Sequence, residues 1–154
     1  SGRYNDLDLS YLNHPVKSLF FGISASNSDP TNDRFTFKNA DLQVNGTPLI
    51  ENMSPIYYHT VQNYYKSKYG VSDFRVSTQD LMYTRFFAYH FCLNASDYNP
   101  SGTCNFSRLD NAKLIIRGTE TGSLRTTQEH MYVIATNYTV LRIKGGLAGI
   151  LCGN

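Results

Sequence analysis

The 154-residue sequence predicts an all-β domain, an antiparallel β-sandwich of jelly-roll topology with one short helix in a connection. Aromatic residues form 14% of the chain, with 12 Tyr and 9 Phe, and aromatic side chains favour strands. Charged residues form only 17%, below the roughly 25% typical of soluble domains. Turn-rich segments separate long apolar runs, without the strand–helix alternation of a parallel sheet. Other antiparallel sandwiches fit this periodicity too, and the jelly roll is the preferred variety among them.

The first third of the chain contains two predicted strands and a hairpin turn. Residues 16–24 form a short apolar run rich in strand formers, and dense turn residues follow it. Residues 34–46 alternate apolar and polar side chains, which predicts one long strand or two strands with a bulge near Asn39. Asn45-Gly46 is a strong signal for a two-residue hairpin turn, and the chain restarts as a strand beyond it.

Residues 54–70 are predicted to form the connecting helix. Ser54 is a suitable N-cap, Pro55 fits the first helical position, and Gly70 fits the C-cap. The apolar residues between them follow helical spacing only loosely. The sequence therefore predicts one helix here, between two strands.

The rest of the chain contains three predicted long strands. They cover residues 81–93, 103–116 and 131–146, and turn-rich loops separate them. A tail of small residues follows the last strand. Its glycine-rich segment 144–149 lacks the Gly-Lys-Ser/Thr ending of a phosphate-binding loop. We therefore expect these small residues to pack closely against a neighbouring wall.

The histidines, cysteines and carboxylates lack the spacing of a catalytic or metal site. Cupin-type jelly rolls hold a metal on a His-x-His pair, but no His here has another His two or four positions away. Three cysteines without Cys-x-x-Cys spacing predict reduced thiols and folding in the cytosol. Loop carboxylates are ordinary turn formers. We therefore expect no catalytic residue, no metal and no cofactor. The side chains considered are His14, His59, His90, His130, Cys92, Cys104, Cys152, Asp97, Asp110, Glu120 and Glu129.

The charge distribution and the apolar runs exclude two classes of partner. The net charge is +2 with a pI near 8.4, and the basic residues are scattered, which predicts no direct binding of nucleic acid. No run approaches the roughly 18 apolar residues of a membrane span, so we expect no insertion into a membrane. The chain starts with Ser rather than Met, which favours a fragment of a longer polypeptide.

Residues 99–118 combine a turn with a predicted strand. In Asn99-Pro100-Ser101-Gly102, Pro fixes φ, Gly permits a positive φ, and Asn or Ser can bond to nearby amides. On the strand that follows, Arg108 and Asp110 lie two residues apart and are expected to share a face. Nothing in this stretch requires a substrate, so we interpret it as a structural corner.

The same stretch carries a resemblance to a known family. "PSGTCNFSRLDNAKL", following "YTRFFAYHFCLN", resembles the signature of the C-terminal jelly roll in major capsid proteins of nucleocytoplasmic large DNA viruses. That family includes the capsid proteins of iridoviruses, chlorella viruses and mimivirus relatives. Its pattern is an aromatic-rich strand, a short loop and then Pro-Ser-Gly-x-x-Asn-x-Ser-Arg. The matching residues are Pro100, Ser101, Gly102, Asn105, Ser107 and Arg108.

Three further segments agree with the family in the same order. Residues 13–23 are similar to the Pro-Val-Lys strand that opens the domain, and residues 39–51 precede a tyrosine-rich helix as in the family. Residues 135–154 are similar to its closing strand and small-residue C-terminus. The resemblance therefore spans nearly the whole chain, and the Pro-Ser-Gly motif is its most specific part.

The resemblance implies a structural virion protein without an active site or a cofactor. In the family, two jelly rolls in one polypeptide stand side by side, and three such chains form a pseudo-hexagonal capsomer of an icosahedral shell around an internal membrane. Residues 1–154 would form a single jelly-roll domain, the C-terminal half of such a double jelly-roll protein. We expect five of the matching residues to fix the corner geometry and the register of the neighbouring strand: Pro100, Ser101, Gly102, Asn105 and Arg108.

The resemblance also implies partners and a location. The partners would be the N-terminal jelly roll of the same chain, two further copies in a homotrimer, neighbouring capsomers and minor capsid proteins. The domain could lie near the internal membrane without inserting into it. Assembly in the host cytoplasm would place the protein in the capsid shell of the virion.

This chain departs from the family in its size, because it contains only one jelly roll. A free-standing single-domain relative is therefore an alternative to a fragment. Two rival functions also fit a jelly roll: a carbohydrate-binding module, in which exposed tyrosines stack on sugars, and a cupin-like metalloenzyme. Neither rival explains why the Pro-Ser-Gly corner, the Pro-Val-Lys opening and the closing strand occur in family order.

Overall fold

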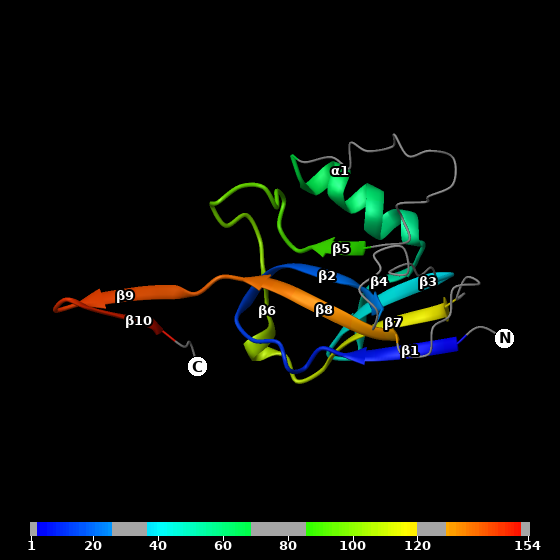
Figure 1. Cartoon of the computed structure of the whole chain (residues 1–154), viewed down its shortest axis with the longest axis horizontal. Helices are drawn as coiled ribbons and strands as arrows, with labels where there is room; N and C mark the ends of the chain where they lie inside the picture. Colours follow the sequence, from blue (N-terminus) through cyan, green and yellow to red (C-terminus); the bar gives the residue numbers. More distant parts are fainter. Residues whose placement is uncertain (1–2, 26–36, 69–85, 120–128, 152–154) are drawn as a thin grey trace.

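The computed structural model describes residues 3–25, 37–68, 86–119 and 129–151, and these residues form two antiparallel sheets, one helix and a projecting hairpin (Figure 1). The first sheet has the order β1-β7-β3-β4. Its strands are β1 (Arg3–Asp8), β7 (Ala112–Thr119), β3 (Asn39–Val44) and β4 (Thr47–Met53). In the second sheet, three strands pair with β2 (Pro15–Ala25). They are β5 (Phe86–His90), β6 (Cys104–Asn105) and β8 (Glu129–Asn137).

One hydrophobic core lies between the two sheets. Leu19 and Phe21 of β2 face Leu42 of β3 and Leu114 and Ile116 of β7, and all five are buried in one cluster. The core residues of β3 and β7 are two positions apart, Ala40 and Leu42 on one strand and Leu114 and Ile116 on the other, as expected for strands of a sandwich. The predicted all-β antiparallel sandwich with one helix in a connection is therefore confirmed.

An aromatic cluster closes the core beside the helix. Phe21 stacks on Phe87 with ring centroids 5.3 Å apart, and Phe37 meets Phe87 edge-on at 4.9 Å. Tyr58 packs edge-on against Phe21 at 5.4 Å, and its buried hydroxyl donates to the carbonyl of Ala40 at 2.8 Å. The large apolar rings fill the core, while the one polar tip has an acceptor.

The helix begins at the predicted Pro55 and includes a π-helical segment (Tyr57–Val61) followed by α1 (Gln62–Lys66). The carbonyl of Ser54 accepts the amide of Tyr57 at 3.0 Å, whereas the proposed C-cap Gly70 lies outside the described residues. In Figure 1 the helix lies along β5, at the edge of the second sheet.

The helix satisfies both backbone groups of His90, the last residue of β5. Gln62 Oε1 accepts from the amide of His90 at 3.0 Å, and Lys66 Nζ donates to its carbonyl at 2.8 Å. An edge strand otherwise presents unpaired N–H and C=O groups to other chains. The helix therefore both completes the core and protects this edge.

The predicted hairpin turn at Asn45-Gly46 is confirmed. Both residues have a positive φ, 49° and 76°, as a type I′ turn requires, and they join β3 to β4. The Asn45 side chain also accepts the amides of Asp110 and Asn111, at 3.1 and 3.2 Å. The register of β3 against β4 shifts between Ala40 and Leu42, close to the irregularity predicted near Asn39.

The predicted strand over residues 103–116 is wrong in its middle. The chain forms the two-residue β6, then a 3-10 helix (Phe106–Arg108) and a turn, and extends again only at β7. The side chain of Asn105 accepts the amide of Ser107 at 3.1 Å, and this local bond replaces the ladder. Arg108 and Asp110 therefore do not share a strand face. The strand predicted over 81–93 also ends early, at His90, and residues 81–85 lie outside the described range.

The predicted final strand over residues 131–146 is two strands. β8 ends at Asn137 because its partner β2 has no residue left beyond Val16 and Pro15 to pair with. The chain then pairs with itself: β9 (Val140–Lys144) and β10 (Leu147–Leu151) form a hairpin through Gly145-Gly146. The prediction that the small residues of the tail pack against a wall is also wrong within this chain, because β9 and β10 are exposed throughout.

Candidate assembly surface

The Pro-Ser-Gly corner is held by close backbone contacts. Ser101 Oγ accepts the amides of Leu93 and Asn94, both at 3.2 Å. Gly102 has a φ of 149°, and a Cβ at this position would lie 2.8 Å from the carbonyl oxygen of Phe91. Only glycine fits both this backbone conformation and this approach. Pro100, beside them, is exposed.

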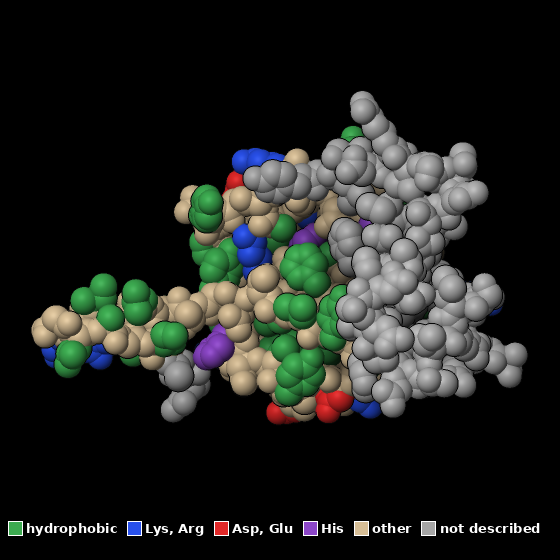
Figure 2. Space-filling model, in the orientation of Figure 1, with side chains coloured by type: hydrophobic (Ala, Val, Ile, Leu, Met, Phe, Trp, Pro, Cys, Tyr) green, Lys and Arg blue, Asp and Glu red, His purple; other side chains and the backbone are tan. Residues whose placement is uncertain are grey.

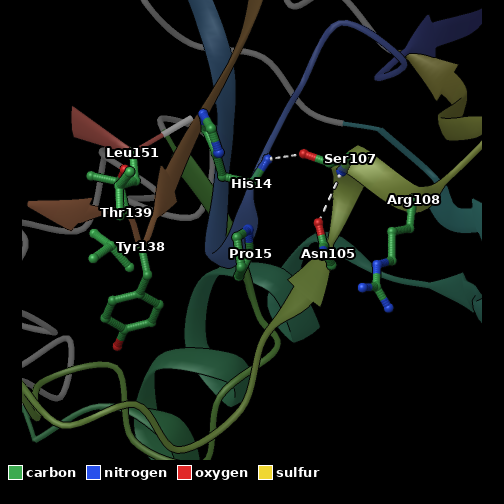
Figure 3. Close-up of a pocket in the computed structure, with 9 residues that line it drawn as sticks. His14, Pro15, Asn105, Ser107, Arg108, Tyr138, Thr139 and Leu151 are labelled. Atoms are coloured by element: carbon green, nitrogen blue, oxygen red, sulfur yellow. Dashed lines mark hydrogen bonds between the residues drawn. The ribbon is translucent and has the colours of Figure 1, made fainter. Parts of the chain in front are cut away.

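The second half of the motif clamps the start of β2. Ser107 Oγ accepts the amide of His14 at 2.8 Å, and the amide of Phe106 donates to the carbonyl of His14 at 3.1 Å (Figure 3). His14 has a φ of 70°, a left-handed conformation that is uncommon for a non-glycine residue. Two hydrogen bonds from one turn thus fix the residue that directs the chain into Pro15.

The closing segment meets β2 at the same place. The amide of Tyr138 donates to the carbonyl of Pro15 at 2.9 Å, and Asn137 Nδ2 donates to the carbonyl of Asn13 at 3.2 Å. Three segments that are far apart in sequence therefore converge at the first residues of β2. They are the opening, the corner and the closing strand, which are the segments that carry the family resemblance.

A pocket of about 470 Å³ opens at this junction, and residues of the β9–β10 hairpin form part of its lining (Figure 3). It is lined by His14, Pro15, Asn105, Ser107, Arg108, Tyr138, Thr139, Val140 and Leu151. Arg108 is exposed, and its guanidinium extends to one side of the pocket in Figure 3. Within the lining, Ser107 Oγ is bonded to the backbone amide of His14, and Pro15, Val140 and Leu151 supply apolar surface.

Of the six motif residues, four make hydrogen bonds or close contacts that hold the corner: Ser101, Gly102, Asn105 and Ser107. Asn105 acts through its bond to the Ser107 amide. Pro100 and Arg108 are exposed, and Arg108 lines the pocket. Their role in register and assembly stays a prediction.

His90 is buried in a network of hydrogen bonds between β2, β5 and the helix. Its Nδ1 lies 2.8 Å from Ser18 Oγ, and its Nε2 lies 2.9 Å from Asn63 Oδ1. Asn63 Nδ2 donates to the carbonyl of His59, so Oδ1 is the atom that accepts from Nε2–H. Burial, and then the positive charges of Lys66 and Lys17, lower the pKa of His90 from 6.5 to about 4. The ring is therefore neutral near pH 7, with Nδ1 accepting from the Ser18 hydroxyl.

The remaining chemistry-bearing side chains are dispersed. Cys92 is buried, Cys104 is half-buried with a pKa raised by burial, and both are free thiols, while Cys152 lies outside the described residues. Among the residues that the structure describes, no three His, Cys, Asp or Glu side chains lie close enough together to hold a metal ion. The junction at the start of β2 contains backbone hydrogen bonds and a pocket with apolar residues in its lining.

Sequence comparison identifies the family. The sequence model of the large eukaryotic DNA virus major capsid proteins matches residues 2–149. The chain belongs to this family. The major capsid protein of Pyramimonas orientalis virus is 31% identical over 155 residues, which cover 93% of this chain and 38% of that protein. The major capsid protein of Paramecium bursaria Chlorella virus 1 is 31% identical over 134 residues, covering 75% of this chain and 28% of that protein.

Solved capsid structures share the fold. A chain of the PBCV-1 virus capsid superimposes with a TM-score of 0.73 at 22% identity, over 99% of this chain and 46% of that chain. The Faustovirus major capsid protein gives a TM-score of 0.58 at 13% identity, over 84% of this chain and 29% of that one. This capsid-family chain therefore has the jelly-roll fold of a structural capsid domain, and it spans less than half the length of these relatives.

The sequence predicts the corner but not two other parts of this surface. No pattern in the sequence marks His14 as a residue held by hydrogen bonds, and the periodicity of residues 131–146 predicts one strand where the structure has a strand and a hairpin. The Gly145-Gly146 pair, with φ of 60° and 78°, was the available signal for a second hairpin turn.

Proposed function

We propose that this capsid-family chain is one jelly-roll unit of a double jelly-roll major capsid protein, and that three such polypeptides form a pseudo-hexagonal capsomer. The observation that carries the proposal is the structural match, which covers 99% of this chain but only 46% of the PBCV-1 capsid chain. A polypeptide of that length has room for a second unit of similar size. Residues 1–154 would then be the C-terminal unit.

The proposed role is assembly, without catalysis and without a cofactor. The junction of the opening, corner and closing segments supports this role, because it is built from backbone hydrogen bonds and contains an exposed Arg108 and a pocket whose lining includes Tyr138, Val140 and Leu151. Such groups suit a protein–protein contact, in which Arg and aromatic side chains are enriched.

The proposed partners are the second jelly roll, two symmetry mates, neighbouring capsomers and minor capsid proteins. The proposed location is the capsid shell of the virion, with assembly in the host cytoplasm and contact to an internal membrane but no insertion. In the described part of the chain, no helix is long and apolar enough to span a membrane. Binding of nucleic acid is not part of this role.

The test is the mass of the native polypeptide, detected in its source with an antibody against this domain. A polypeptide well over twice 17.4 kDa that sediments as a trimer would support the proposal. A native chain of about this length would instead indicate a free-standing jelly roll. Binding of that chain on a glycan array would then support a carbohydrate-binding module, for which exposed tyrosines such as Tyr64 and Tyr65 are available.

A further inference from the structure

One face of the β9–β10 hairpin continues the lining of the pocket at the start of β2. Val140 and Leu151 are directly paired in the hairpin, so their side chains share a face, and both line the pocket. Alternate residues of a strand lie on the same face, which places Arg142 and Lys144 on the face of Val140. The pocket and this face of the hairpin therefore form one continuous surface.

The described residues of this surface include three cations and no carboxylate. Arg108 is the one Arg or Lys in the pocket lining, which contains no Asp or Glu. In Figure 3 it lies at the opposite end of the lining from Leu151. The hairpin adds Arg142 and Lys144, and residues 137–151 contain no acidic residue. Arg108, Arg142 and Lys144, together with the pocket, are here called the basic track.

The cations of the basic track have no partner within the described chain. All three are exposed, and none makes a hydrogen bond or an ion pair there. By contrast, Lys66 Nζ donates to the carbonyl of His90 at 2.8 Å, and Lys68 Nζ lies 2.9 Å from a carboxylate oxygen of Asp97. In Figure 2 the Lys and Arg side chains of the hairpin lie along its lower edge. The cations of the track are therefore available to an anionic partner.

The apolar part of the lining favours a peptide over a nucleic acid. Pro15, Tyr138, Val140 and Leu151 supply this part, and Val140 and Leu151 are 61% and 45% exposed. Binding to a phosphate backbone leaves such groups in water and gains affinity with each phosphate that is neutralised, so three cations give little. A carboxylate with an apolar neighbour satisfies both parts of the surface, since Arg binds carboxylates through two parallel hydrogen bonds.

The backbone of the hairpin favours a peptide in the extended conformation. Because the two-residue turn closes on Lys144, the N–H and C=O groups of Leu141 and Ile143 point away from β10. Within the described chain β9 pairs with β10 alone, and an open strand edge is a template for a further strand. The hairpin projects from the body, so a separate chain can reach this edge (Figure 1). Alternate side chains of an added strand lie about 6.6–6.8 Å apart, which is also the spacing of Arg142 and Lys144.

We propose that the basic track binds an extended acidic segment of a second protein. The segment adds a strand to the open edge of β9, and one of its apolar side chains enters the pocket beside Val140. Carboxylates at alternate positions pair with Arg142 and Lys144, and a further carboxylate pairs with Arg108. The site goes beyond the proposed capsomer, because all its residues belong to this chain and none requires a second jelly roll or a symmetry mate.

Titration of the 154-residue chain with synthetic peptides, followed by amide NMR shifts, tests the site. The probes are the capped peptide Glu-Thr-Glu-Thr-Leu-Thr-Glu and its reversed sequence, one for each direction in which a strand can pair. At low ionic strength one of them should bind with a Kd below about 1 mM and shift the amides of β9. The same peptides with Gln in place of Glu should bind at least about tenfold more weakly, and added salt should weaken only the acidic peptide.

Charge reversal assigns the binding to named residues. Arg142→Glu and Arg108→Glu should each weaken the acidic peptide at least about tenfold, because an attraction becomes a repulsion. Lys38→Glu is the matched control: it changes the net charge equally at an exposed cation of the body and should change the Kd less than about twofold. A peptide with Lys in place of the Glu that faces Arg142 should regain affinity for the Arg142→Glu chain. Circular dichroism verifies the fold of each variant.

Four results overturn the inference. They are a wild type that binds neither acidic peptide below about 1 mM, equal binding of the Gln peptides, equal weakening by Lys38→Glu, and tighter binding of a single-stranded oligonucleotide through Arg142. Binding by the 154-residue chain but not by a longer native polypeptide overturns the assignment to a second protein, because the polypeptide then covers the track itself. A chain that forms the proposed trimer but binds no acidic peptide overturns this inference alone and leaves the capsomer standing.

Discussion

Substitution of Gly102 by alanine is expected to strain the corner in two ways. The φ of 149° lies in a region that L-residues rarely adopt, and the added Cβ would lie 2.8 Å from the carbonyl oxygen of Phe91 and 3.2 Å from the Cα of Cys92. Both neighbours are backbone atoms, so neither can move aside by a change of rotamer. The strand end and the corner would have to separate.

The size of the effect follows from these two terms. A backbone held in a sparsely populated region costs about 1–3 kcal/mol, and relief of the overlap by a backbone shift adds about 1 kcal/mol. The lower entropy of unfolded alanine offsets roughly 0.4–1 kcal/mol. We expect Gly102→Ala to lower the free energy of unfolding by about 2–3 kcal/mol, which for a domain of this size lowers Tm by about 5–10 °C.

Two other glycines separate the causes. Gly46 has a φ of 76° with open space around its missing Cβ, so Gly46→Ala should show the backbone strain alone, about 1 kcal/mol. Gly149 has neither a positive φ nor a close neighbour, so Gly149→Ala should change the free energy by less than about 0.5 kcal/mol. Urea unfolding followed by circular dichroism measures all three. A Gly102→Ala protein as stable as Gly149→Ala would refute the reasoning.

Three further predictions concern the buried network and the junction. Because the folded pKa of His90 lies below its value of 6.5 in the unfolded chain, stability should be full above pH 6.5 and fall by roughly 3 kcal/mol as the pH decreases to about 4. Urea titrations should show a clearly smaller loss of stability with pH in His90→Asn, and an equal loss would mean that another group causes it. Lys66 and Lys17 are the cations that face the His90 ring. Ser107→Ala should cost about 1 kcal/mol in the same assay, because it leaves the amide at the start of β2 without its acceptor, while Ser107→Thr should retain stability. The Tyr138 hydroxyl is buried without a partner among the described residues, so Tyr138→Phe should leave Tm unchanged or raise it, and a lower Tm would reveal an acceptor.

The sequence by itself determined the features that depend on neighbouring residues. The turn at Asn45-Gly46 and the helix start at Pro55 follow from the backbone preferences of two or three adjacent residues, and both are where they were predicted. The composition predicted the strand-rich fold, because it is rich in aromatic residues, which favour strands, and poor in charged residues. The Pro-Ser-Gly motif could be recognised from the sequence because the backbone conformation at Gly102, with a φ of 149°, favours glycine.

Only the tertiary structure decided where strands end and what their residues meet. β8 stops at Asn137 because β2 offers no further partner, and the 3-10 helix after Asn105 replaces a strand because Ser107 is needed to hold His14, 93 positions away in sequence. The ends of these strands are set by pairing between segments that are distant in sequence. The hydrophobic periodicity of a single segment does not show where such pairing stops. The same holds for the junction at the start of β2 and for the burial of His90, because each is decided by which distant segments pack together.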